Sequence, residues 1–312
     1  MNRLDLVFDE GQTAQLLDYK SLVAALRVAC LDYEDGRIQS PARLIMPFGT
    51  KATMLSMPAS APDIAVHKLV NVSPDNGARG LPTIHASVTA YSVDTGIPLF
   101  SLDGATVTAR RTAAISALAI GTLRPNPPKS VLLFGTGKQA IQHVQVLTAL
   151  YPDLTIFVRG RTAQASSGFC DEWRAMNRNL SPLPDGGALP KVDVVITATT
   201  SRTPVYEAGA TAETLIVGVG SFKPDLAEIG ASTVLNSTIF VDDLVGAHHE
   251  AGDLIQASID WKDVRSLASA TGGSVDFERP TFFKSVGCAA WDLAACRLAR
   301  QTLESDGRLK KA

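Results

Sequence analysis

The chain has 312 residues and a formal net charge of −2, which gives no electrostatic reason to expect nucleic acid or an anionic membrane as a partner. With 46% hydrophobic and 19% charged residues, the composition is typical of a globular protein of about two domains. The N-terminus is too acidic for a signal peptide and no segment approaches a membrane span, so we expect a cytoplasmic protein. The four cysteines lack metal-ligand spacing, and we expect no metal site and no disulfide framework.

The first third of the chain mixes helical and strand patterns. Residues 16–31 have helical periodicity, and shorter alternating strands follow around Leu44 and Met54 and over residues 65–72 and 87–92. Glycine and proline turns separate these strands. An alanine-rich stretch, residues 106–123, predicts a second helix, and the stiff connector 124–128 after it predicts a domain edge.

Residues 131–134 form a short apolar run that is typical of a buried parallel strand. Gly135, Gly137 and Ala140 follow it in G-x-G-x-x-A spacing, and a helical pattern begins there. In such a turn the first glycine permits the tight bend, the second lets a phosphate approach the backbone, and the small third residue lets helix and strand pack closely. The helix directs its N-terminal amides at the anion. The pattern therefore predicts a dinucleotide site rather than a plain turn.

The end of the next strand, residues 155–158, predicts which cofactor binds. NAD enzymes usually place a carboxylate there to bind the ribose hydroxyls, but this chain has Arg159, Gly160, Arg161 and Thr162. Guanidinium groups can hold a 2′-phosphate through paired hydrogen bonds, so we expect NADPH, with NADH as the alternative cofactor. The other interpretation is that these arginines are merely solvated.

Three further apolar runs, residues 192–198, 214–219 and 238–241, are suited to burial on both faces of a sheet. Alternation of strands and helices predicts an α/β fold with a Rossmann-type doubly wound parallel sheet. The last helix, residues 286–303, has small and apolar residues at helical spacing and is expected to return to the first domain.

An ordered set of short motifs extends over nearly the whole chain. They are Arg43–Pro47, Lys68–Val70, Gly80–Thr83, Asp103–Gly104, Thr108–Ala114, Gly135–Ala140, Val241–Asp243, Glu250–Leu254 and Lys284–Gly287. Together they resemble the ornithine cyclodeaminase/mu-crystallin family. The resemblance implies a Rossmann domain over residues 119–287 and an α/β substrate-binding and dimerisation domain formed from residues 1–118 and 288–312. It also implies a homodimer.

The resemblance implies that small α-amino or α-imino acids are the substrates and that Arg43, Lys68 and Arg111 hold their carboxylate. A guanidinium fork with a lysine charge suits a carboxylate. Arg110 is adjacent to Arg111 in a helix and must point elsewhere. Surface charge is the alternative for Arg43 and Lys68, but Lys68 lies in a strand that otherwise looks buried, which favours a functional role.

The resemblance also implies further contact residues. Thr83 and Phe222 are expected beside the substrate. The expected cofactor-binding residues are Gly135, Thr136, Gly137, Lys138, Gln139, Ala140, Arg159, Arg161, Thr162, Thr199, Thr200, Val219, Ser285 and Gly287.

One departure from the family pattern bears on the reaction. Cyclodeaminase and alanine dehydrogenase members carry an aspartate where this chain has Phe222. Without that carboxylate, the group best placed to take a proton from an ammonium is missing. The loop around Phe222 resembles the ketimine reductases of the family, which implies NADPH-dependent reduction of Δ1-pyrroline-2-carboxylate to L-proline and of Δ1-piperideine-2-carboxylate to L-pipecolate. The alternatives are an amino acid oxidoreductase or cyclodeaminase, and a non-catalytic small-ligand binding protein.

Lys68 is the candidate catalytic residue, because it could supply the proton to the ring nitrogen if neighbouring arginines lower its pKa. His143 and His67 are expected to pack away from the substrate, whereas His85 is as consistent with a substrate contact as with a structural role. For Glu250 and Asp253, a contact in the active site and a cap of the helix that begins there are equal alternatives.

Overall fold

The computed structural model describes residues 6–309, which fall into two compact units. One unit contains the residues up to Arg111 together with those from Cys288 onward, and the other contains Thr112–Gly287. The boundary lies within helix α3 (Gly104–Leu123). No helix of the described residues is long and apolar enough to cross a bilayer.

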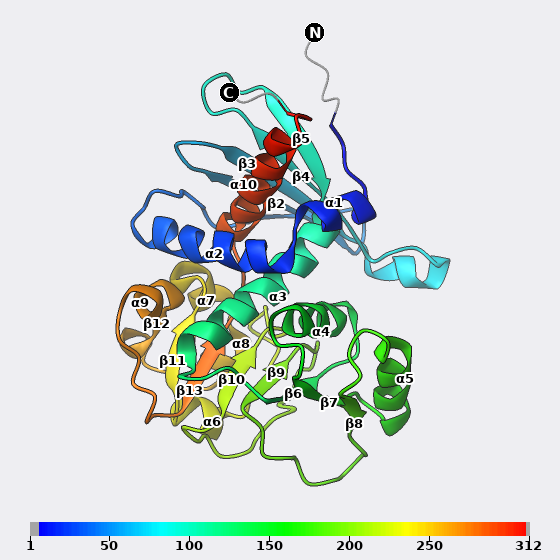
Figure 1. The fold of residues 1–312 in the computed structure, drawn as a ribbon, viewed down its shortest axis with the longest axis vertical. Coiled ribbons are helices and arrows are strands. Elements are labelled where there is room, and N and C mark those ends of the chain that lie inside the picture. The colour runs from blue at the N-terminus through cyan, green and yellow to red at the C-terminus, as the bar shows by residue number, and fades with distance from the viewer. Residues whose placement is uncertain (1–5, 310–312) are drawn as a thin grey trace. The chain divides into compact units, whose positions relative to one another are not determined.

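The first unit is built on an antiparallel sheet in which each strand pairs with its neighbour in sequence (Figure 1). Its strands are β1 (Leu44–Phe48), β2 (Ala52–Ser60), β3 (Ala65–Val72), β4 (Ile84–Tyr91) and β5 (Pro98–Asp103). Its other elements are α1 (Glu10–Leu16), α2 (Tyr19–Glu34), the 3-10 helix η1 (Pro74–Arg79) and α10 (Ala289–Ser305). Helix α10 packs on β2, β3, β4 and α2, and its many alanines allow this close approach.

The alternation of side chains along β3 decides where Lys68 lies. Val66, Lys68 and Val70 share one face of the strand and are all buried. A lysine on such a face must find a partner inside the unit, because an unpaired buried charge is strongly unfavourable.

The second unit contains a parallel sheet of eight strands in the order β12-β11-β13-β10-β9-β6-β7-β8. Its strands are β6 (Ser130–Phe134), β7 (Thr155–Arg159), β8 (Leu180–Pro182), β9 (Val194–Thr197), β10 (Leu215–Gly218), β11 (Thr238–Val241), β12 (Arg265–Ser266) and β13 (Thr281–Lys284). The chain leaves β6 toward β7 and β8 and then returns to β9 on the other side of β6. This reversal is the topological switch point at which doubly wound sheets bind ligands. The predicted α/β class with a Rossmann-type sheet is confirmed.

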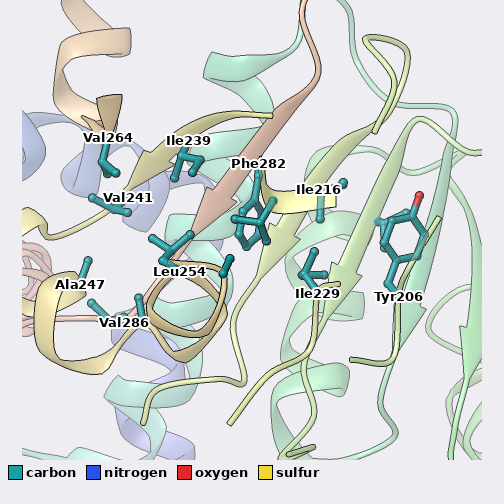
Figure 2. Close-up of a cluster of buried hydrophobic side chains, with 14 of the residues drawn as sticks. Tyr206, Ile216, Ile229, Ile239, Val241, Ala247, Leu254, Val264, Phe282 and Val286 are labelled. Carbon is teal, nitrogen blue, oxygen red and sulfur yellow. The ribbon is translucent and has the colours of Figure 1, made fainter. Parts of the chain in front are cut away.

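Short helices connect these strands. They are α4 (Lys138–Leu150), α5 (Ala163–Trp173), α6 (Ala231–Leu235), α7 (Leu244–Glu250), α8 (Gly252–Gln256), η2 (Trp261–Asp263) and α9 (Leu267–Gly272). Figure 2 shows the core on one side of the sheet, where Ile216 and Phe282 from the strands meet Ile229 and Leu254. This packing fixes the segments after β10 that carry part of the candidate site.

Two predicted helix boundaries were wrong. The helix predicted over residues 16–31 is present as α2, but it begins at Tyr19, because α1 ends at Leu16. Asp18 separates them by accepting a hydrogen bond from the Ser21 amide as an N-cap. The last helix begins at Ala289 rather than at residue 286, because Gly287 has a left-handed φ of 75° that a helix cannot continue.

Candidate active site

The glycine turn after β6 has the backbone that a dinucleotide phosphate requires. Gly135 has a φ of 118°, and a Cβ there would lie 2.5 Å from the carbonyl oxygen of Ala198. Gly137 is the N-cap of α4, and no side chain caps the helix. A Cβ on Gly137 would meet no atom within 4 Å. An open, uncapped helix N-terminus fits a phosphate group.

The predicted phosphate and ribose residues lie around this turn and at the end of the next strand. Thr136, Lys138, Gln139 and the buried Ala140 form the turn and the start of α4. Arg159 ends β7, and its Nη2 donates to the carbonyl oxygen of Pro184 at 3.1 Å. Arg161 is exposed, and the Thr162 hydroxyl accepts from the Ala165 amide at 3.2 Å as the N-cap of α5. The Thr162 side chain is therefore engaged in capping.

One buried carboxylate joins the loops that follow β9 and β10. Oε1 of Glu228 accepts from the amide and hydroxyl of Thr199, at 2.6 and 2.8 Å. Oε2 accepts from the amides of Gly220 and Ser221, at 2.6 and 3.0 Å. Thr200 is adjacent to Thr199, and Val219 precedes Gly220 as a buried residue. Glu228 thus fixes both loops in which we expected cofactor contacts.

A second carboxylate, Asp253, holds the backbone at Glu228 and pairs with a buried lysine. Oδ1 of Asp253 accepts from the amides of Glu228 and Ile229, at 2.6 and 3.0 Å. Its Oδ2 lies 2.9 Å from Nζ of Lys284 at the end of β13, and all three charged side chains are buried. Burial raises the pKa of Glu228, and the positive charge of Lys284 opposes that rise. Asp253 is therefore part of a buried charge network.

Ser285 and Gly287, both predicted to bind the cofactor, are held by one aspartate. The Ser285 hydroxyl donates to Oδ2 of Asp242 at 2.7 Å, and the Gly287 amide donates to the same oxygen at 3.0 Å. The amide of Val286 donates to Oδ1 at 2.9 Å. The segment after β13 thus has a fixed backbone at the carboxyl end of the sheet.

The first unit contains a separate buried cluster of charged side chains. Nζ of Lys68 lies 2.7 Å from Oδ2 of Asp292 and donates to the hydroxyl of Thr108 at 3.3 Å. Nε of Arg111 lies 3.4 Å from Oδ1 of Asp292. Lys68 is 1% exposed, Arg111 6% and Asp292 0%. One carboxylate thus faces two cations.

Burial is the main cause of a low pKa at Lys68. It lowers the pKa of the ammonium from 10.5 to about 8, and the positive charges of Arg111 and Arg43 act in the same direction. The Asp292 carboxylate opposes this change. The electrostatic effect of Arg43 on Lys68 indicates that the three predicted carboxylate-binding residues lie near one another. A lysine with a pKa of about 8 can exchange a proton near neutral pH.

Arg110 points away from this cluster, as predicted. Its guanidinium lies 3.8 Å above the ring of Tyr19, and its Nε and Nη2 donate to the carbonyl oxygen of Leu17. Thr83 is exposed, and its carbonyl oxygen accepts from the Ser73 amide. Phe222 lies in the second unit, 42% exposed, after β10.

Two of the histidines, His143 and His67, contact groups of the protein itself. His143 is fully buried, with Nδ1 near the carbonyl oxygen of Gln139 and Nε2 near the hydroxyl of Ser116, and burial lowers its pKa to about 4. His67 contacts the hydroxyl of Ser56 through Nε2. No group of three or more potential ligands for a metal ion is present among residues 6–309.

Four charged residues of these networks were not predicted to belong to a site: Asp242, Glu228, Lys284 and Asp292. A signal for Asp292 was present in the sequence. It lies three residues after Ala289 and four before Cys296, on the helix face that was expected to be buried. Glu228 lies in a loop without periodicity, and no comparable signal marked it.

Comparisons with known proteins agree with this architecture. The model of the ornithine cyclodeaminase/mu-crystallin family matches residues 6–307. The chain is 55% identical over 298 residues to the Δ1-pyrroline-2-carboxylate/Δ1-piperideine-2-carboxylate reductase of Azospirillum brasilense, covering 95% of this chain and 96% of that protein. It is 53% identical to Δ1-pyrroline-2-carboxylate reductase 2 of Burkholderia ambifaria, covering 96% of each.

A solved structure is similar over almost the whole chain. Thermococcus litoralis Δ1-pyrroline-2-carboxylate reductase, in complex with NADH and L-proline, superimposes with a TM-score of 0.87 at 26% identity, covering 98% of this chain and 100% of that one. The extent of the family match and the identity to the bacterial reductases establish the family. The chain belongs to the ornithine cyclodeaminase/mu-crystallin family.

Proposed function

We propose that the protein reduces the C=N bond of cyclic imino acids, converting Δ1-pyrroline-2-carboxylate to L-proline and Δ1-piperideine-2-carboxylate to L-pipecolate. The identity of more than half the residues to reductases named for these substrates supports this oxidoreductase function. The observation in the structure that carries it is the buried cluster of Lys68, Arg111 and Asp292. The cluster pairs a proton-exchanging lysine with a guanidinium suited to a carboxylate.

The residues of the cluster have separate tasks in this reaction. Arg111 and Arg43 bind the substrate carboxylate and fix the orientation of the ring. Lys68 donates a proton to the ring nitrogen, which receives the electron pair of the C=N bond when C2 is reduced. Phe222 provides an apolar wall for the ring methylenes. The nicotinamide cofactor supplies the hydride to C2 when it is bound.

We assign NADPH as the preferred cofactor. The uncapped N-terminus of α4 and the positive φ of Gly135 support a pyrophosphate site after β6. Arg159 and Arg161 follow β7 where an NAD enzyme usually has a carboxylate, and they suit the 2′-phosphate. Thr199, Thr200, Val219, Ser285 and Gly287 complete the proposed cofactor site at the carboxyl ends of the strands.

A homodimer is the proposed assembly. Edge strand β1 is exposed along its whole length, and Leu44, Ile45, Met46 and Phe48 are 64, 61, 47 and 44% exposed. A run of exposed apolar side chains on an edge strand is a typical interaction surface. We assign it to a second copy of this chain, and sedimentation at several protein concentrations tests the assignment.

Initial rates test the proposed reaction. The purified protein is given each cyclic imino acid with NADPH or NADH, and ornithine with NAD serves as the control assay. We expect rapid oxidation of the reduced cofactor with the imines and no ammonia from ornithine, because Phe222 replaces the acidic residue of the deaminating members. Ammonia release from ornithine without imine reduction would refute the proposal.

A further inference from the structure

Asp292 links the two cations on which the proposed reaction depends. It lies in the first turn of α10, with one carboxylate oxygen 2.7 Å from Nζ of Lys68 and the other 3.4 Å from Nε of Arg111. Lys68 lies on β3 and Arg111 on α3. A single side chain therefore sets the separation of two groups that come from different elements.

The remaining hydrogen-bonding capacity of the cluster is suited to a ligand. The Lys68 ammonium has three donors, and within residues 6–309 it contacts only Asp292 and Thr108. Nε of Arg111 has no hydrogen-bond partner among the described residues and lies 3.4 Å from Oδ1 of Asp292. Two positive charges face one negative charge, so the cluster has an excess positive charge that a substrate carboxylate would neutralise.

Stability alone is a poor explanation for this arrangement. Replacement of a buried ion pair by well-packed apolar side chains is often neutral or stabilising. The Asp292 carboxylate would also compete with an anionic substrate for Lys68 and Arg111, which is a disadvantage if pairing with these cations is its one role. Its effect on the protonation of Lys68 gives it a purpose in the reaction.

We propose that Asp292 is a positioning residue that keeps Lys68 protonated and aligned with Arg111 for proton donation to the substrate. The inference rests on the proposed function in taking Lys68 as the proton donor. Asp292 itself does not need to touch the substrate.

The charged surroundings of Lys68 support this role. Burial and the positive charges of Arg111 and Arg43 lower the pKa of the lysine, whereas the charge of Asp292 and its hydrogen bond raise it. The thiol of Cys296, one turn along α10, stays neutral because burial and the charge of Asp292 raise its pKa, so it adds no charge near Lys68. Loss of the Asp292 charge must therefore lower the pKa of Lys68 below about 8.

The variant D292N tests the inference, because it keeps the shape of the side chain and removes its charge. The protonation of Lys68 is followed directly by NMR titration of protein labelled at lysine Cε, and the Lys68 signal is identified by its absence in K68M. We expect the acid dissociation constant of Lys68 to rise at least about tenfold in D292N. The falling limb of the kcat profile should move to lower pH by the same factor. An unchanged dissociation constant would overturn the inference.

Three further variants guard against misfolding and against a general effect of charge removal. D292E retains the carboxylate and should restore the dissociation constant of Lys68, and D292S provides a second uncharged side chain if D292N does not fold. D63N is the matched control, because Asp63 also pairs with an α10 cation, Arg297, but is not in contact with Lys68. It should leave the titration of Lys68 unchanged.

The two assays separate this inference from the proposed function. A shifted NMR titration with an unshifted kcat profile would support the role of Asp292 in keeping Lys68 protonated and would refute Lys68 as the proton donor. A shift in both would support both. Equal titration of Lys68 in D292N and the parent protein would refute the inference, whatever the rate of imine reduction.

Discussion

Nζ of Lys284 lies 2.9 Å from Oδ2 of Asp253, and neither side chain has any exposure to solvent. Asp253 also accepts a hydrogen bond from the backbone amide of Glu228. The ion pair therefore fixes the position of Glu228, whose carboxylate holds the loops after β9 and β10. The network lies at the carboxyl end of the parallel sheet, where a doubly wound fold binds its ligand. Its integrity should therefore affect both stability and cofactor binding.

The replacement Lys284→Met should strongly destabilise the protein, because it leaves Asp253 and Glu228 buried together without their cation. Removal of one partner of a buried pair typically costs about 3–5 kcal/mol. Urea unfolding followed by circular dichroism measures the loss. Arg202→Met removes an exposed pair with Asp225 in the same unit and should cost less than about 1 kcal/mol. Similar small losses in the two variants would contradict the structural role of Lys284.

The replacement Glu228→Gln should weaken cofactor binding more than it slows turnover at saturation. An amide retains one acceptor oxygen, so the amide of Thr199 or those of Gly220 and Ser221 lose their partner. A lost hydrogen bond to a charged group costs about 1.5–3 kcal/mol, which corresponds to a rise in Kd of roughly tenfold or more. Fluorescence titration with NADPH measures this Kd. An unchanged Kd would show that the loops do not depend on Glu228.

Replacement of Arg159 and Arg161 by serine should raise the KM for NADPH by roughly tenfold to a hundredfold and should change the KM for NADH little. The reason is the loss of charge-assisted hydrogen bonds that one cofactor has and the other lacks. Arg174→Ser is the control, because Arg174 is an exposed arginine in the same unit that pairs with Asp171. Equal effects on the two cofactors would refute the assignment of these arginines to the 2′-phosphate.

The parts of the fold that sequence reasoning could predict are those with a local signal. Apolar runs marked β6, β7 and β9. The apolar neighbours Val66, Leu69 and Val70 indicated that Lys68 lies in a buried strand. Strand β13 was missed, because it ends in Lys284, whose charge conflicts with an apolar pattern. The lysine is tolerated there through Asp253, which comes from a distant helix.

The helical spacing could place Asp292 on a buried face, but the partners within the charged networks could not be predicted from local signals. Asp292 meets Lys68 and Arg111 only after α10 packs on the sheet, and an acid in the first turn of a helix is ordinary in itself. Glu228 accepts hydrogen bonds from the amides of Thr199 and Gly220, which are separated from it in sequence, and no periodic pattern connects these residues. Tertiary packing, rather than local sequence preference, determines which groups the carboxylates of Asp292 and Glu228 contact.

Lys68→Met and Arg111→Met should have different kinetic effects. Lys68→Met removes the proton donor, so kcat/KM should fall by at least about a hundredfold and the kcat profile should become flat. In the parent protein, kcat should fall as pH rises through about 8, where Lys68 loses its proton. Arg111→Met removes orientation and charge, so its defect should appear mainly in KM, with the falling limb retained. A near-normal kcat with an unchanged profile in Lys68→Met would assign the proton to water.

Deuterium transfer tests the central claim most directly. The protein is incubated with Δ1-pyrroline-2-carboxylate and NADPH that carries deuterium at both C4 positions of the nicotinamide, and the product is analysed by mass spectrometry and chiral chromatography. The proposed reaction predicts L-proline with one deuterium at C2, and K68M should form it at a small fraction of the parent rate. Absence of proline, or proline without deuterium at C2, would contradict the assignment of this protein as a cyclic imino acid reductase.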